Sequence, residues 1–90
     1  MNIHPSLLPK YGGKGMYGMN IHKAVKKNKE TETGITIHLV NKDYDKGKII
    51  FQKRIEISTG LMADDIALKV KELERVYFPQ IIEEYLLKQP

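Results

Sequence analysis

Two side chains that can stabilise charge and move protons lie close together near the start of the chain. Asn2 and His4 are separated by one residue in the run Asn2-Ile3-His4-Pro5. In an extended segment, residues at this spacing project from the same face. A carboxamide N–H and a protonated imidazole can both donate hydrogen bonds to a developing oxyanion. The pair could stabilise a tetrahedral intermediate, but the spacing alone is a weak signal and is more typical of an ordinary surface loop.

Other titrating side chains are available at a distance along the chain. Asp43 and Asp45 lie in a turn-rich segment, His38 lies near the end of a β-rich segment, and Glu74 lies in a helical one. The chain has no cysteine, which excludes thiolate chemistry and disulfides. Both aspartates lie in one loop, and physical reasoning alone does not distinguish Asp43 from Asp45.

The elements that must position these residues follow from hydrophobic periodicity. Residues 2–18 hold two prolines and four glycines, which predicts a long loop. Apolar residues then recur at helical spacing over 19–27 and from 64 to about 88, and they alternate over 34–40 and 48–57. We expect the two alternating segments to pair as an antiparallel hairpin and Pro79 to kink or split the last helix. The predicted class is α/β, with two β-strands followed by a long C-terminal helix kinked at proline.

Composition places the chain among small globular proteins. It has 90 residues, 41% apolar and 29% charged, with a net charge of +4. No apolar run approaches the length that spans a bilayer, so we expect a cytoplasmic protein without a membrane partner. The lysines crowded into the first third would attract an anion, or they form a solvated helix face. With Tyr11 and Tyr17 they also leave open a small basic nucleic-acid-binding module.

A longer pattern adds a family resemblance. The run Asn2-Ile3-His4-Pro5-Ser6-Leu7-Leu8-Pro9-Lys10-Tyr11 resembles the signature loop of the phosphoribosylglycinamide formyltransferases nearly residue for residue. Similarity continues in 34–38, in Asp45-Lys46-Gly47 followed by 49–52, and in Glu74 ahead of Phe78-Pro79. The resemblance implies that residues 1–90 are the C-terminal catalytic part of a formyltransferase domain with a doubly wound sheet.

The resemblance also implies an activity and its site. It implies transfer of the formyl group of 10-formyltetrahydrofolate, as co-substrate, to the amine of glycinamide ribonucleotide in purine biosynthesis, without a metal. The implied catalytic residues are Asn2, His4 and Asp45, the last selected over Asp43 by the family pattern Asp-x-Gly. Asn2 and Glu74 are implied to bind substrate, with Glu74 on the ribose hydroxyls, and His38 is expected to give structural support near the site.

One part of the family pattern has no counterpart in these residues. No Gly-rich phosphate-binding turn follows a strand, so we expect the N-terminal nucleotide-binding half to be absent. Two such chains could then associate as a homodimer to cover an exposed sheet edge. The alternatives are formyltetrahydrofolate deformylase, methionyl-tRNA formyltransferase and an inactive fragment, and the run from Pro5 to Lys10 favours the transferase. The role of the long loop 12–20 stays open.

Overall fold

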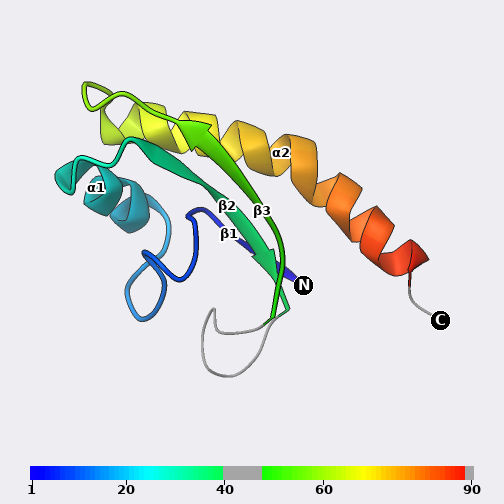
Figure 1. The fold of residues 1–90 in the computed structure, drawn as a ribbon. Coiled ribbons are helices and arrows are strands. Elements are labelled where there is room, and N and C mark those ends of the chain that lie inside the picture. The colour runs from blue at the N-terminus through cyan, green and yellow to red at the C-terminus, as the bar shows by residue number, and fades with distance from the viewer. Residues whose placement is uncertain (40–47, 89–90) are drawn as a thin grey trace.

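The computed structural model describes residues 1–39 and 48–88. Asp43 and Asp45 lie outside these described residues. The prediction of an α/β class with a long C-terminal helix is confirmed (Figure 1). In chain order the elements are β1 (Asn2–His4), α1 (Met19–Lys27), β2 (Glu32–His38), β3 (Ile49–Glu56) and α2 (Ala63–Leu87).

The described strands form one sheet in the order β1-β2-β3, with both pairs antiparallel. The predicted hairpin of β2 and β3 is confirmed, and its register shifts between Ile37 and His38. The third strand corrects the prediction of two, because β1 lies in the segment that the sequence analysis assigned to a loop. Asn2 pairs with His38, and His4 pairs with Thr36. A three-residue strand is too short to show alternation, so its pairing with β2 defines it.

The two faces of the sheet have different characters. Ile35 and Ile37 are fully buried at alternate positions of β2, as their spacing predicts. The side chains of Thr36 and His38, at the other alternate positions of β2, belong to the opposite face, which is polar. On the apolar side the sheet and both helices share one core of buried residues, formed by Ile21, Val25, Ile35, Ile57, Ile66 and Val70.

Helix α1 packs against α2 through one side only. Its buried residues are Ile21, His22 and Val25, which lie together on a helical surface. Lys26 connects the two helices, because its Nζ donates to the carbonyl of Leu61, just before α2, at 2.7 Å. Lysines in the last turn of α1 and aspartates in the first turn of α2 both complement the helix dipoles.

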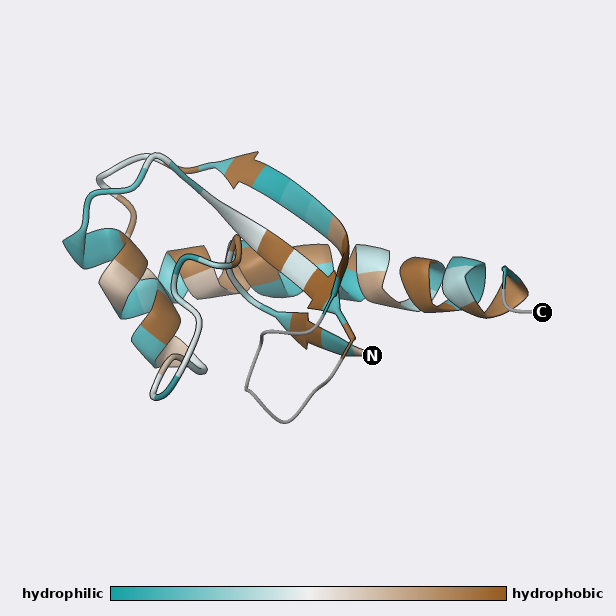
Figure 2. Ribbon diagram, turned by 60° about the horizontal axis from the view of Figure 1, so that its bottom comes forward, coloured by the Kyte–Doolittle hydropathy of each residue, from teal (hydrophilic) through white to brown (hydrophobic). Residues whose placement is uncertain are grey.

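Helix α2 continues through Pro79 as one element, so the prediction that proline splits it is wrong. Pro79 is exposed, and water can therefore reach the carbonyl that loses its helical partner, while Ile81 beyond it is buried. A kink at this position stays a prediction. Polar and apolar residues alternate along α2 to its end (Figure 2). Among the described helices, none is long and apolar enough to cross a membrane.

Candidate active site

Strand β1 places Asn2 and His4 on the polar face of the sheet. Residues two apart in a strand share a face, and directly paired residues share it too. Asn2 and His4 therefore lie on the same side as their partners His38 and Thr36. Asn2 is exposed, whereas only 5% of the surface of His4 is accessible. One end of the pair is open to a ligand and the other is enclosed by the protein.

The loop that follows β1 orients the His4 ring. Its Nε2 lies 2.8 Å from the carbonyl oxygen of Tyr11. A carbonyl oxygen only accepts hydrogen bonds, so Nε2 is the donor and carries a proton. Tyr11 has a positive φ of 58°, a left-handed conformation at the point where the loop turns back over the ring. The loop conformation thus holds the imidazole in one orientation.

Thr36 attaches the first part of this loop to β2. Its Oγ1 donates to the carbonyl of Ser6 at 2.7 Å and accepts from the N–H of Leu8 at 3.0 Å. Gln52 Nε2 donates to the same oxygen at 2.9 Å and to the carbonyl of Leu8 at 2.9 Å. One buried hydroxyl thereby uses its donor and both acceptor positions. Through these bonds the polar face of the sheet fixes the segment directly after His4.

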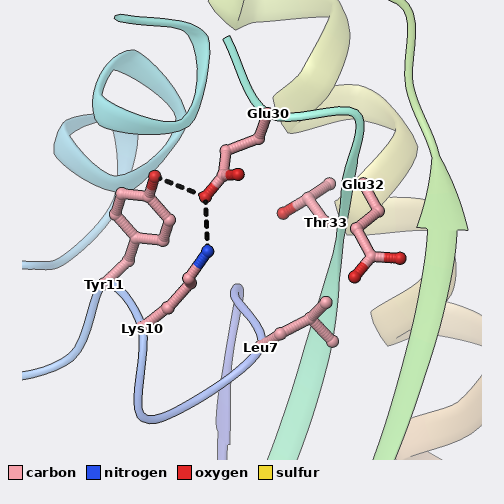
Figure 3. A pocket seen from close by; sticks show the side chains of 6 residues that line it. All are labelled: Leu7, Lys10, Tyr11, Glu30, Glu32 and Thr33. Carbon is pink, nitrogen blue, oxygen red and sulfur yellow. Dashed lines mark hydrogen bonds and ion pairs between the residues drawn. The ribbon is translucent and has the colours of Figure 1, made fainter. Parts of the chain in front are cut away.

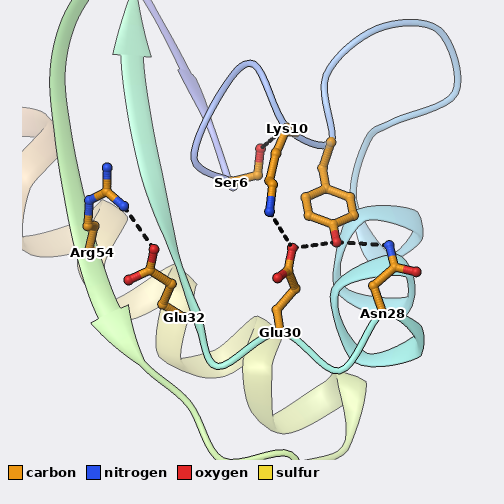
Figure 4. A network of polar contacts seen from close by, with 7 residues as sticks. Ser6, Lys10, Asn28, Glu30, Glu32 and Arg54 are labelled. Carbon is orange, nitrogen blue, oxygen red and sulfur yellow. Dashed lines mark hydrogen bonds and ion pairs between the residues drawn. The ribbon is translucent and has the colours of Figure 1, made fainter.

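A second group of contacts attaches the loop to the segment after α1 (Figure 4). Tyr11 donates its hydroxyl to Glu30 Oε2 at 2.7 Å, Lys10 Nζ lies 3.3 Å from the same oxygen, and Asn28 donates to the Tyr11 oxygen. The hydrogen bond from Tyr11, and then Lys10, lowers the pKa of Glu30 below its ordinary value, against the effect of desolvation. Burial, with the nearby Glu30 carboxylate, raises the pKa of Tyr11.

A small cavity lies between this contact group and β2 (Figure 3). Its volume of about 50 Å³ has room for only about one or two water molecules. The Oγ1 of Thr33 points toward it and is buried without a hydrogen-bond partner among the described residues. The cavity is too small for a substrate. Its lining residues are Leu7, Lys10, Tyr11, Glu30, Glu32 and Thr33.

A larger cavity, of about 250 Å³, opens between the loop, α1 and α2. It places Glu74 in the same cavity as Pro5, the residue directly after His4. Partial burial raises the pKa of the Glu74 carboxyl, and Lys71 opposes this effect. The cavity therefore joins the predicted sugar-binding residue to the predicted catalytic loop. Its full lining is Pro5, Gly18, Met19, His22, Ala67, Lys71 and Glu74.

His22 is a cavity residue that the sequence analysis did not single out. It was overlooked because its helix was interpreted as an apolar side opposite a lysine side. The available signal was its position between Ile21 and Val25 on the buried surface of α1.

The remaining predicted site residues are His38 and Asp45. His38 is buried, and its Nδ1 lies 3.0 Å from the carbonyl of Leu39, a contact that holds the ring at the end of β2. Asp45 lies outside the described residues, so the proposed trio is seen only through Asn2 and His4. Within residues 1–39 and 48–88, no group of three or more His, Asp or Glu side chains is placed to hold a metal ion.

Comparisons with known proteins add evidence that is independent of the geometry of the site. Residues 1–82 match the family model described as formyl transferase. The chain is 38% identical over 82 residues to the chloroplastic phosphoribosylglycinamide formyltransferase of Arabidopsis thaliana, covering 91% of this chain and 28% of that protein. It is 35% identical over 82 residues to the Escherichia coli phosphoribosylglycinamide formyltransferase, covering 91% of this chain and 36% of the relative.

Solved structures agree with these relatives. The crystal structure of phosphoribosylglycinamide formyltransferase from Bacillus halodurans superposes with a TM-score of 0.83 at 30% identity, covering 97% of this chain and 42% of that one. The structure of the Coxiella burnetii protein in complex with CHES gives a TM-score of 0.77 at 38% identity, covering 89% and 35%. The chain thus spans less than half the length of each of these proteins.

Proposed function

Because the chain belongs to the formyl transferase family, we propose that it is the C-terminal catalytic part of a phosphoribosylglycinamide formyltransferase. This enzyme would transfer the formyl group of 10-formyltetrahydrofolate to the amine of glycinamide ribonucleotide, a step of purine biosynthesis. The names of the relatives support the proposal over the deformylase alternative. The observation that carries it is the placement of Asn2 and His4 on one face of β1, followed directly by Pro5, which lines the same cavity as Glu74.

The reaction needs a site that stabilises one oxyanion and moves one proton. The substrate amine forms a bond to the formyl carbon, and the carbonyl electrons move to oxygen. The Asn2 amide and a protonated His4 donate hydrogen bonds to that oxyanion. The carbonyl then re-forms, the bond from carbon to the folate nitrogen breaks, and the proton lost by the attacking amine ends on that nitrogen. In this scheme His4 exchanges its bond to the Tyr11 carbonyl for one to the oxyanion.

The other predicted residues have supporting roles in the proposal. In the proposal, Asp45 orients His4. Glu74 accepts hydrogen bonds from the ribose hydroxyls, and His38 supports the end of β2. The scheme uses no metal ion.

The proposed site is shared with a part of the protein that these residues do not represent. The chain corresponds to 28% and 36% of the lengths of two relatives, so the phosphate-binding turn would come from the N-terminal half of the domain. Homodimer formation stays a prediction. We propose the cytoplasm as the compartment, and the chloroplastic name of the Arabidopsis relative makes a plastid the alternative.

A formyl-transfer assay tests the proposal. We would use the longest natural protein chain that contains these residues, with glycinamide ribonucleotide and 10-formyltetrahydrofolate, beside the E. coli relative as positive control. We expect transfer that falls by about 10²- to 10⁴-fold in His4→Ala. Exposed Asn2→Ala, which disturbs folding less, should lose about 10²- to 10³-fold. Glu83→Ala, on the exposed side of α2, is the matched control.

The products distinguish the alternatives. Formate released without transfer would identify a deformylase instead. Absence of any turnover, beside an active E. coli control, would contradict the proposed function.

A further inference from the structure

His22 is a buried polar residue, and one of its two ring nitrogens has no hydrogen-bond partner among the described residues. Only 5% of its surface is accessible, and its Nδ1 is buried with no hydrogen bond among the described residues. Burial also lowers the pKa of the His22 imidazole, which keeps the ring neutral at physiological pH. A neutral imidazole has one N–H donor and one nitrogen acceptor, and the buried Nδ1 is available to a ligand in one of these roles.

Such a residue costs stability that an apolar one would not. Most buried polar side-chain atoms in proteins have a hydrogen-bond partner, and a buried group without one carries its desolvation penalty uncompensated. Leucine or phenylalanine would suit the same position, because Ile21 and Val25 beside it are part of the apolar core. A polar residue at such a place is explained if its partner is a ligand.

The surroundings of His22 identify where that ligand would bind. His22 lines the cavity of about 250 Å³ that also contains Glu74, with α1 contributing one wall and α2 another. Glu74 offers a half-buried carboxylate that accepts hydrogen bonds from hydroxyl groups. The cavity thus presents a carboxylate acceptor and a neutral imidazole from two different helices. Two adjacent hydroxyl groups on one ligand match this pair.

We propose that His22 is a substrate-binding residue that hydrogen-bonds one hydroxyl of the vicinal diol on the nucleotide's ribose, while Glu74 accepts from the neighbouring hydroxyl. The inference rests on the proposed function and adds a residue to its sugar site. His22 lies outside the reacting formyl group and takes no part in the chemical step. It acts on affinity and on the choice between ribose and deoxyribose substrates.

The test compares substrates that differ by one hydroxyl. In the longest natural chain containing these residues, KM and kcat would be measured for glycinamide ribonucleotide and for its 2′-deoxy and 3′-deoxy analogues. His22→Phe keeps the ring shape and removes both hydrogen-bonding atoms. We expect its KM for the natural substrate to rise by about 3- to 10-fold, with the effect concentrated in KM. For the analogue that lacks the contacted hydroxyl, wild type and variant should have equal KM.

Two controls separate binding from folding. His22→Gln keeps a donor and an acceptor and should recover part of the affinity. His22→Phe should unfold at the same temperature as the wild type or higher, because it removes a buried unpartnered nitrogen. An unchanged KM in His22→Phe would overturn the inference, and so would an equal loss for all three substrates, which indicates a structural role.

A direct binding measurement separates this inference from the proposed function. With ¹⁵N-labelled histidine, glycinamide ribonucleotide should shift the His22 ring signals, and Glu74→Gln should weaken that shift. A shift without formyl transfer would contradict the proposed function and leave the sugar site standing. Transfer without a shift would contradict the role of His22 alone.

Discussion

Replacing Thr36 with valine tests how the loop after His4 is held. Valine has nearly the same shape, so the change removes the hydroxyl and leaves the packing. The buried N–H of Leu8 and carbonyl of Ser6 then lose their hydrogen bonds. Gln52 also loses its bond to the hydroxyl but keeps its bond to the Leu8 carbonyl. A buried group left unsatisfied costs about 1–3 kcal/mol. Two such groups predict a loss of about 2–6 kcal/mol in the free energy of unfolding.

Thr33→Val is the matched control for this prediction. Thr33 lies in the same strand and is equally buried, but its hydroxyl has no hydrogen-bond partner among the described residues. The same chemical change should therefore be neutral or stabilising by up to about 1 kcal/mol.

Urea unfolding followed by circular dichroism measures both variants. With a slope of about 1–3 kcal/mol/M, Thr36→Val should lower the midpoint by about 1 M or more relative to Thr33→Val. Equal midpoints for the two variants would refute the conclusion that Thr36 anchors the loop. A lower midpoint for Thr33→Val than for Thr36→Val would show that the Thr33 hydroxyl contributes more to stability than the Thr36 hydroxyl.

Two further predictions concern residues outside this loop that contact it. Gly34→Ala should destabilise by more than about 3 kcal/mol, because the new Cβ would overlap the Lys53 carbonyl and lie 2.9 Å from Leu7 Cδ2. Gly60→Ala, with its nearest atom at 3.9 Å, should be nearly neutral in the same urea titration, and similar losses in both would argue against this packing. The pKa of Glu30 is lower in the folded chain than its ordinary value. Its ionised carboxylate therefore stabilises the folded state, by less than about 1 kcal/mol, and this contribution is complete at pH values above the ordinary glutamate pKa. The contribution is lost as the pH falls through the lower pKa of the folded state. Urea midpoints from pH 7 to pH 3 should fall less in Glu30→Gln than in the wild type, and parallel curves would contradict the assignment.

Local pattern was sufficient for the larger elements. Alternation of β-branched residues predicted the hairpin, and apolar spacing after Asp64 predicted α2 within one residue of its observed end. Both signals come from neighbours in the chain. The spacing of Asn2 and His4 likewise predicted a shared face, which holds because β1 is extended.

Other features depend on contacts between distant segments, which periodicity does not contain. Strand β1 exists because Thr36 and His38 lie beside it. Pro79 stays inside α2 because its exposed side tolerates the lost hydrogen bond and Ile81 still packs. The cavity that His22 and Glu74 share could be found only once the packing of α1 on α2 was known.

The pairing of β1 also bears on the order in which the chain folds. Asn2 meets His38 across more than thirty residues, whereas β2 and β3 form a hairpin from neighbouring segments. Closing the longer loop costs more chain entropy, so the hairpin can form before β1 docks. The backbone amides of β1 should then be among the first to exchange with deuterium when the native state opens locally. The two residues proposed to hold the oxyanion would thus lie in the least protected strand, and their readiness for catalysis would depend on how often that strand detaches.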